Sequence, residues 1–350
     1  MVSETTNQDS LSALLPERYP EHDLFICDVQ DAVLKDVMPQ MEHPFYALSK
    51  KPERTVRRYE HNGNWVEITP SVKGLATIYD KDILIYCISQ LMAKLKAGEK
   101  VTARVKINSR DLLRFINRGT SGYEYKALIQ ALDRLEGTRI RTNVRTGNEE
   151  QIDGFGLIDA SSIRRQHGLD GRLISCEIRL SDWVFNAIKS NEVLTLHRNY
   201  FRLRKPLERR VYELARKHCG HQKKWRVSLG VLLKKSGSQS SSKLFRKMIK
   251  ALAESNHLPD YFVSYEHESD MVLFANRMAQ KEDTVSTELS FFALKGETYE
   301  GAKEEAPGWD VYYLEREWVS WLDENEIIPK NPDRHFLKFC GTWFQNHGSP

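Results

Sequence analysis

Apolar and polar positions in the middle of the chain are spaced in a way that predicts two similar runs of helices and strands. Around residues 121–137, apolar side chains recur at helical spacing, at Tyr125, Leu128, Ile129, Leu132 and Leu135. The stretch that begins at Ser241 has a comparable pattern, at Leu244, Phe245, Met248, Ile249 and Leu252. Both stretches are therefore expected to be amphipathic helices that dock on a core through one face.

Each of these helices has the same kinds of neighbours along the chain. In the first run they are a helix at 80–98, a strand at 101–108, a helix capped by Ser109, and strands at 138–144 and 151–159 joined by the turn "RTGNEE". In the second run they are a helix from Pro206 to Gly220, a strand at 225–229, the helix of "GVLLKKSG", and strands at 261–266 and 271–276. The order helix, strand, helix, helix, strand, strand is therefore predicted twice.

The two runs superpose with a constant offset of 120 residues. Leu112 and Leu113 match Leu232 and Leu233. In the next helix the matching pairs are Ile129 with Ile249, Ala131 with Ala251, and Leu132 with Leu252. One shared offset across two helices indicates an internal duplication, and two copies are too few for a solenoid. We therefore predict an α+β protein with two tandem winged-helix (helix-turn-helix) domains.

In a winged helix the third helix can enter the major groove of DNA, and the following hairpin can contact the backbone. Such a helix needs Lys and Arg for phosphates and short polar residues for base edges on its exposed side. In the second run the DNA-binding candidates are Ser241, Ser242, Lys243, Arg246, Lys247 and Lys250. In the first run they are Ser121, Tyr123, Lys126, Gln130, Arg134, Arg139, Arg141 and Arg145, with Arg139, Arg141 and Asn143 on one face of a strand. The simpler alternative is that these lysine-rich faces are only solvated.

The charge distribution supports a polyanion partner. The formal net charge is +4, but residues 1–50 carry a net charge of −6 and residues 281–350 a net charge of −7. The stretch between them therefore carries +17, which is the electrostatic footprint expected of a nucleic-acid-binding body between acidic ends.

The tail predicts a small helical module that the duplication does not explain. Asp310 can cap one helix, with Trp309 and Leu314 as a hydrophobic staple and an apolar stripe at Val311, Leu314, Trp318 and Trp321. Asn331 and Pro332 begin another helix with Phe336, Cys340 and Trp343. Four of the seven tryptophans of the chain lie here, which argues for a folded module. We predict that Trp309, Trp318, Trp321 and Trp343 form its core and, where exposed, a partner-binding surface.

Several classes of protein are disfavoured. The chain has no run of apolar residues long enough to span a membrane and no basic N-terminal region of a secretory signal. Its five scattered cysteines lack a CxxC pair, which is typical of a reduced, intracellular protein without structural zinc. Neither a phosphate-binding GxxxxGK[ST] loop nor a His-x-His metal pair of nicking enzymes occurs, and "HCGH" at 218–221 has the wrong spacing. We expect no catalytic residues, no metal and no cofactor.

Four longer phrases carry a resemblance to a known family. They are "GLATIYDKDILIYCISQLM" (74–92), "ALDRLEGTRIRTNV" (131–144), "LSDWVFNAI" (180–188) and "NYFRLRKPLERRVYELARKHCG" (199–220). The stretch "MEHPFYALSKKPERTVRRYEHNGNWVEITPS" adds to it. Over about residues 22–277 the chain resembles the replication initiator protein A family of plasmids and mobile elements.

The resemblance implies a DNA-binding replication initiator that binds direct repeats (iterons) of double-stranded DNA at an origin. It further implies recruitment of the host initiator and of the replicative helicase or its loader, a homodimer that represses its own promoter, and a cytoplasmic location on the plasmid or nucleoid. The alternatives are a winged-helix transcriptional repressor without a role in replication and, less favoured, a DNA-nicking initiator. Repeats beside an AT-rich stretch would favour the initiator, whereas a single promoter palindrome would favour the repressor.

The predicted organisation has five parts: an N-terminal arm (1–40), a first winged-helix domain (41–190), a second winged-helix domain (191–277), a linker (278–290) and a helical module (291–350). Asn62 and Gly63 separate two strand-like runs and predict a hairpin that extends the sheet of the first domain. The alternative for this segment is an arm that contacts DNA through Arg57 and Arg58.

Overall fold

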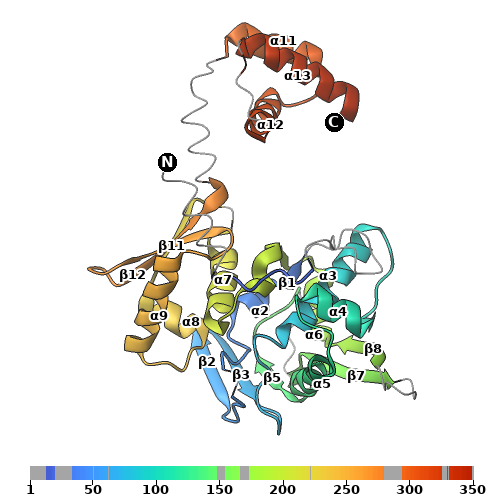
Figure 1. Cartoon of the computed structure of the whole chain (residues 1–350), viewed down its shortest axis with the longest axis vertical. Helices are drawn as coiled ribbons and strands as arrows, with labels where there is room; N and C mark the ends of the chain where they lie inside the picture. The colour runs from blue at the N-terminus through green and yellow to red at the C-terminus, as the bar shows by residue number, and fades with distance from the viewer. Residues whose placement is uncertain are drawn as a thin grey trace. The chain divides into compact units, whose positions relative to one another are not determined.

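The computed structural model describes residues 13–19, 34–49, 51–61, 63–147, 154–165, 173–220, 222–279, 294–324, 329 and 331–348. The chain forms two compact units, one of residues 1–277 and one of residues 278–350 (Figure 1). Most of the predicted arm (1–40) and linker (278–290) lies outside the described residues. The division of the larger unit at residue 190 stays a prediction, because residues on both sides of it share one hydrophobic core.

The described part of the larger unit mixes helices with four small sheets. Its helices are α2 (Met38–Glu42), α3 (Lys81–Lys96), α4 (Ser109–Phe115), α5 (Gly122–Gly137), α6 (Asp182–Lys189), η1 (Arg198–Arg202), α7 (Pro206–His218), α8 (Leu229–Ser236) and α9 (Ser242–Ser255). One sheet pairs β1 (Lys35–Val37) with β9 (Val193–Thr195). Another has the order β2-β3-β5-β6, from Arg57–His61, Asn64–Thr69, Arg139–Thr142 and Phe155–Gly156.

The remaining two sheets belong to two repeats of the same topology, which we call the first repeat (81–180) and the second repeat (206–276). The first has the sheet order β4-β8-β7, from Arg104–Ile107, Leu173–Leu180 and Ile158–Arg165. The second has the order β10-β12-β11, from Lys224–Ser228, Met271–Asn276 and Tyr261–Glu266. Helices α4 and α8, and α5 and α9, start 120 residues apart, as the sequence predicts.

The predicted hairpin of the first repeat is wrong in its position. Strands 138–144 and 151–159 were expected to follow the third helix as the hairpin of the repeat. Their described parts do pair, Ile140 with Phe155, but β5 also pairs with β3 and thereby joins a different sheet. The hairpin that matches β11–β12 is β7–β8, later in the chain. The segment 139–156 is an insertion whose strand-like pattern resembles that of a hairpin of the repeat.

Asn62 lies outside the described residues, but the hairpin predicted around it is confirmed. Strands β2 and β3 pair antiparallel with His61 opposite Asn64. Their inner face carries Val66 and Ile68, which are buried. The sheet therefore covers the core with one face.

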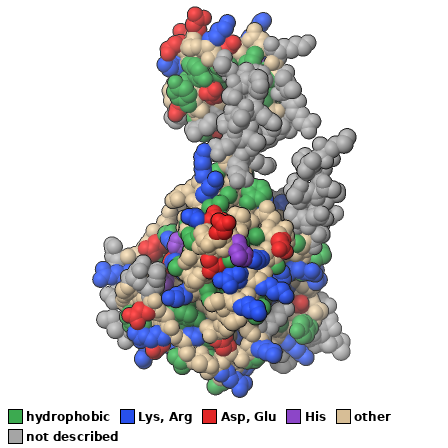
Figure 2. All heavy atoms as spheres, turned by 90° about the vertical axis from the view of Figure 1, so that its left-hand side faces the viewer, with side chains coloured by type: hydrophobic (Ala, Val, Ile, Leu, Met, Phe, Trp, Pro, Cys, Tyr) green, Lys and Arg blue, Asp and Glu red, His purple; other side chains and the backbone are tan. Residues whose placement is uncertain are grey.

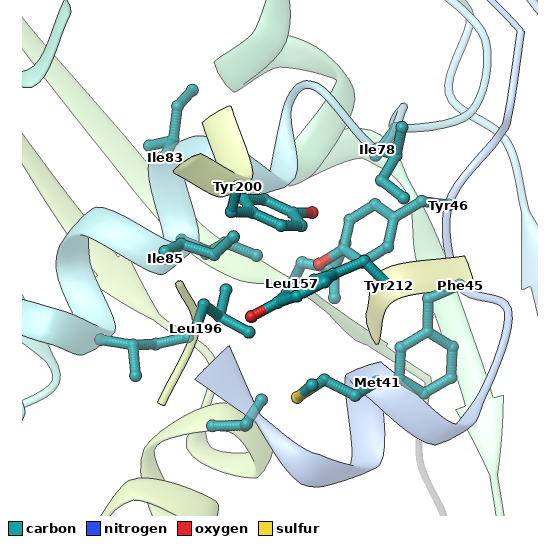
Figure 3. Close-up of a cluster of buried hydrophobic side chains, with 14 of the residues drawn as sticks. Met41, Phe45, Tyr46, Ile78, Ile83, Ile85, Leu157, Leu196, Tyr200 and Tyr212 are labelled. Atoms are coloured by element: carbon teal, nitrogen blue, oxygen red, sulfur yellow. The ribbon is translucent and has the colours of Figure 1, made fainter. Parts of the chain in front are cut away.

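The first helix of each repeat lies in the centre of the larger unit. In α3 every residue from Lys81 to Met92 is buried, and in α7 every residue from Leu207 to Ala215 is buried. Figure 3 shows part of this core, in which Ile83 and Ile85 of α3 and Tyr212 of α7 are among the labelled buried side chains. A helix buried on all sides has no solvated face, so its polar residues must find partners inside the protein.

Charged pairs satisfy these buried polar groups. Lys81 Nζ lies 2.6 Å from Asp36 Oδ2 and 3.0 Å from Glu213 Oε1, with all three side chains fully buried. Burial raises the pKa of Asp36 to about 6, against the opposing effect of Lys81. Arg209 donates to Asp82 at 2.6 Å, and both side chains are buried. These contacts join β1, α3 and α7.

The loop before α9 is anchored on the β2–β3 hairpin. Tyr59 Oη and Arg57 Nη1 each donate a hydrogen bond to the carbonyl oxygen of Gly237, at 3.4 Å. Gly237 has φ of +70°, and a Cβ there would meet the Cβ of Pro44 at 2.5 Å. Glycine is therefore required at this contact on both conformational and steric grounds. Arg57 is buried and paired with Glu53, which does not favour the alternative of a DNA-contacting arm at this residue.

The smaller unit has three described helices around its own core: α11 (Gly296–Glu305), α12 (Val311–Glu324) and α13 (Pro332–His347). The predicted caps are confirmed, because Asp310 accepts from the Tyr312 amide at 2.9 Å and Asn331 accepts from the Arg334 amide at 3.1 Å. The sequence did not predict α11, whose apolar face is short and rests on Ala302. None of the helices in the described part of the chain combines the length and apolar composition needed to cross a bilayer.

Candidate nucleic-acid interface

Helix α9 presents a basic face whose position is set by its cap and its core contacts. The Ser241 hydroxyl accepts from the Leu244 amide at 3.4 Å and starts the helix. Phe245, Ile249 and Leu252 are buried and hold the helix on the second repeat. Leu244, expected on that apolar face, is 50% exposed, because it lies at the edge of the stripe that Phe245 and Ile249 define.

Lys243 and Lys247 lie on the exposed side of α9, together with Ser241 and Ser242. The two lysines make no hydrogen bond or ion pair with any described residue. An ammonium group without a carboxylate partner can bind a phosphate without first breaking an ion pair. These two lysines are therefore the strongest phosphate-binding candidates of the second repeat.

Arg246 and Lys250 are held against the adjacent hairpin. The Arg246 guanidinium donates to both Asp270 oxygens, at 3.2 and 3.0 Å, and its Nε also donates to the Tyr265 hydroxyl at 3.1 Å. Its hydrogen bond to Asp270 raises the pKa of Arg246, and the same bond lowers the pKa of Asp270. Lys250 Nζ lies 5.1 Å from the centre of the Tyr265 ring, a cation–π distance. Any phosphate that binds Arg246 must therefore compete with Asp270.

Replacing Asp270 with Asn should strengthen binding to DNA. The change removes a negative charge beside α9 and releases Arg246, so we expect the slope of log K against log salt to steepen by about one unit, as for one added phosphate contact. Fluorescence anisotropy titrations at several salt concentrations measure this slope. The matched variant Glu266→Gln loses a charge that pairs with Arg226 at the same hairpin and should change the slope less. An unchanged or flatter slope in Asp270→Asn would contradict the expectation that released Arg246 contacts a phosphate.

Helix α5, in the equivalent place of the first repeat, is exposed along a polar stripe. Ser121, Tyr123, Lys126 and Gln130 are exposed, and Tyr123 is 78% exposed. Arg134 is different, because its guanidinium makes two hydrogen bonds to Asp80 at 2.7 and 2.8 Å. These bonds raise the pKa of Arg134 and tie α5 to the start of α3. In this structure Arg134 has a structural partner, and the DNA contact predicted for it stays a prediction.

The arginines after α5 lie on β5 of the β2-β3-β5-β6 sheet and just after that strand. Arg139 and Arg141 of β5 are exposed on one face, as their alternation predicts, while Ile140 and Thr142 are buried. The Arg139 guanidinium donates to the carbonyl of Gly154. Arg141 faces Glu67 of β3 across the sheet, and Arg145 is exposed in the turn that follows. In Figure 1 these strands lie between α9 and α5.

Figure 2 looks onto the side of the molecule that carries α9, where Lys and Arg side chains gather over the larger unit with acidic side chains between them. Sequence periodicity identified the basic residues but missed the carboxylates that hold two of them. Asp80 and Asp270 are 54 and 24 residues away from their arginine partners. The only local signal was the presence of each carboxylate at a helix start or hairpin turn.

The four candidate tryptophans of the smaller unit differ in exposure. Trp318 is buried, and its indole N–H donates to His335 at 2.9 Å, so it belongs to the core. Trp309 and Trp343 are partly buried, with ring centres 5.7 Å apart. Trp321 is 39% exposed, because Leu322 takes the buried position of that turn. The structure thus leaves Trp321 exposed and Trp309 and Trp343 partly accessible.

The "HCGH" segment forms no metal site among the described residues. His218 Nε2 lies 2.8 Å from Glu42 Oε2, and the ring stacks on Trp225. Cys219 is buried, and His221 lies outside the described residues. No group of three or more possible His, Cys, Asp or Glu ligands occurs in the described ranges.

Two solved structures are similar to part of the chain. Domains 2 and 3 of RctB share 15% identity, cover 67% of this chain and 94% of that chain, and have a TM-score of 0.48. Pi initiator protein in complex with iteron DNA shares 18% identity, covers 57% of this chain and 91% of that chain, and has a TM-score of 0.41. Both similarities are partial at these TM-scores, so neither identifies the function of this chain.

Sequence comparisons are more specific. A protein of Wigglesworthia glossinidia brevipalpis named "Putative replication protein" is 35% identical over 274 residues, which cover 77% of this chain and 99% of the relative. The family model described as Replication initiator protein A matches residues 35–263. This range includes the β2-β3-β5-β6 sheet, the first repeat, and the second repeat as far as Val263 of β11. The chain belongs to the Replication initiator protein A family.

Proposed function

We propose that this chain initiates replication by binding repeated sites in double-stranded DNA at an origin. The observation that carries the proposal is the exposed face of α9, where Lys243 and Lys247 have no partner among the described residues. Membership of the initiator family and the basic charge of residues 51–280 support it. The Pi initiator, a partial structural match, was solved with iteron DNA.

Under this proposal both repeats are winged-helix domains. Helices α9 and α5 are the groove-facing helices, and β11–β12 and β7–β8 are the wings. The topology of the two repeats supports this, since each has a three-stranded sheet with its hairpin after the third helix. The major groove of B-DNA is wide enough for an α-helix, and each base pair presents a distinct pattern of donors and acceptors there.

Binding to origin DNA tests the proposal directly. The full chain should bind a duplex with the direct repeats that flank its gene at least about a thousandfold more tightly than a scrambled duplex at physiological salt, as specific complexes do. Equal affinity for both duplexes would contradict sequence-specific binding. Transforming a host with a plasmid whose only origin carries these repeats separates the initiator from a repressor, because a repressor would bind the repeats and yet fail to maintain the plasmid.

We also propose that the smaller unit recruits a host replication protein, such as the host initiator, the helicase or its loader. Its described helices expose Trp321 and leave Trp309 and Trp343 partly buried. Residues 281–350 are also acidic, which does not suit DNA. The homodimer that represses the promoter, and action by binding energy without cutting DNA, are parts of the same proposal.

Deleting residues 290–350 should abolish plasmid maintenance and leave DNA affinity within about threefold. The unit has its own core and is compact by itself, so its loss should not unfold the rest. Anisotropy titration and transformation efficiency measure the two effects. A smaller change, Trp321→Ala, should lower maintenance without unfolding the unit. Loss of DNA binding in the truncated chain would refute the assignment of recruitment to this unit.

A further inference from the structure

A recess of about 830 Å³ opens beside α5 in the larger unit. One wall is the polar stripe of that helix, with Tyr123, Gln130 and Arg134. The rest of the lining includes Arg18, Lys51 and Arg204, from three segments far apart in sequence. The volume is within the range of small-molecule binding sites in proteins, which is roughly 300–1,000 Å³.

The recess carries an excess of positive charge. Seven Lys or Arg side chains and two acidic side chains line it. Four of the seven have carboxylate partners: Lys73 has Asp133, Arg134 has Asp80, and Arg118 and Arg209 share Asp82. Arg18, Lys51 and Arg204 are exposed and have no carboxylate within ion-pair distance among the described residues. Three cations from separate segments therefore meet at one hollow, which favours a ligand with more than one negative charge.

The floor of the recess is apolar and aromatic. Leu75, Ile116 and Phe201 are buried there, with Tyr79 partly buried and Tyr123 exposed at the edge. The backbone of duplex DNA presents phosphates and sugars, with its bases stacked away from such a floor. A nucleoside phosphate has a planar apolar base as well as the negative charges, so it can use both the floor and the cations.

We propose that this recess binds a nucleoside phosphate. The phosphates contact Arg18, Lys51 and Arg204, and the base lies on the aromatic floor. The chain lacks a GxxxxGK[ST] loop, so the ligand acts as a bound effector. Because Tyr123 and Gln130 also belong to the proposed DNA-binding face of α5, bound nucleotide and DNA compete. This last step alone rests on the proposed function.

Fluorescence anisotropy of N-methylanthraniloyl-ATP with the full chain tests the site. We expect saturable binding that unlabelled ATP displaces and that inorganic triphosphate displaces at least tenfold less well. The double variant Lys51→Ala with Arg204→Ala should weaken ATP binding at least tenfold. The matched double variant Lys295→Ala with Lys338→Ala removes two exposed cations from the smaller unit, outside the recess, and should leave ATP binding unchanged. Circular dichroism verifies that each variant is folded.

Three results would overturn the inference. The first is the absence of saturable ATP binding up to millimolar concentration. The second is equal displacement by triphosphate and ATP, which would mean that the cations hold any polyphosphate and the floor holds no base. The third has two parts: the parent chain binds no ATP, and the Lys51→Ala with Arg204→Ala variant shows a flatter slope of log K for DNA against log salt than the parent. The ligand of the three cations would then be the DNA backbone. Failure of the proposed function is distinguishable, because ATP would then bind normally and origin DNA would not.

Discussion

Replacing Lys243 and Lys247 together with Ala should flatten the slope of log K against log salt by about two units. Each lysine that neutralises one phosphate contributes about 0.9 to this slope through release of a bound counterion. Affinity should fall for all sequences alike, because phosphate contacts carry no base preference. Anisotropy titrations with origin and scrambled duplexes across a range of salt measure both effects.

The control for this variant removes the same charge from another part of the chain. Lys295 and Lys338 are exposed in the smaller unit, so their double replacement with Ala lowers the net charge equally. It should leave the salt slope within about half a unit. Both double variants change exposed side chains, so unfolding free energy should change by less than about 1 kcal/mol. Equal slopes in the α9 variant and the parent chain would remove this helix from the interface.

Arg209→Ala should destabilise the larger unit by about 3–5 kcal/mol. The change leaves the fully buried carboxylate of Asp82 without its main partner, and loss of one member of a buried ion pair has a cost of this size. Arg209 also donates to the carbonyl oxygens of Phe201 and Leu203, which would lose these bonds. Urea denaturation followed by near-ultraviolet circular dichroism measures the loss.

Two variants show whether buried charge is the cause. Replacing both partners, Asp82→Asn with Arg209→Met, leaves no unpaired charge and should recover a large part of the stability. Arg198→Ala removes an exposed arginine that pairs with Glu17 and should cost at most about 1 kcal/mol. If Arg209→Ala cost no more than Arg198→Ala, the pair with Asp82 would have no special structural role.

The periodic pattern was a good guide to helices and a poorer guide to sheets. Apolar residues at helical spacing and caps such as Asp310 and Asn331 are local signals, and the helices they predict are present. The cap predicted at Ser109 is instead Asn108, whose side chain accepts from the Arg110 amide. A strand needs a partner that periodicity does not name. For this reason 138–144 was assigned to the hairpin of the first repeat, although its strand pairs with β3 as well as β6. Helix α11 was missed because its core contact is made by small side chains such as Ala302.

The sequence alone was sufficient to predict the duplication, the placement of the basic residues on α5 and α9, and the family. These properties are carried by residue type and spacing along one element, which folding does not alter. Only the tertiary structure decided which of the basic side chains have a carboxylate partner and which are available to a ligand. Arg134 and Arg246 have carboxylate partners on other elements, whereas Lys243 and Lys247 have none among the described residues. The physical reason is that an ion pair depends on distance in space, and the chain brings Asp80 and Asp270 to these helices only when it folds.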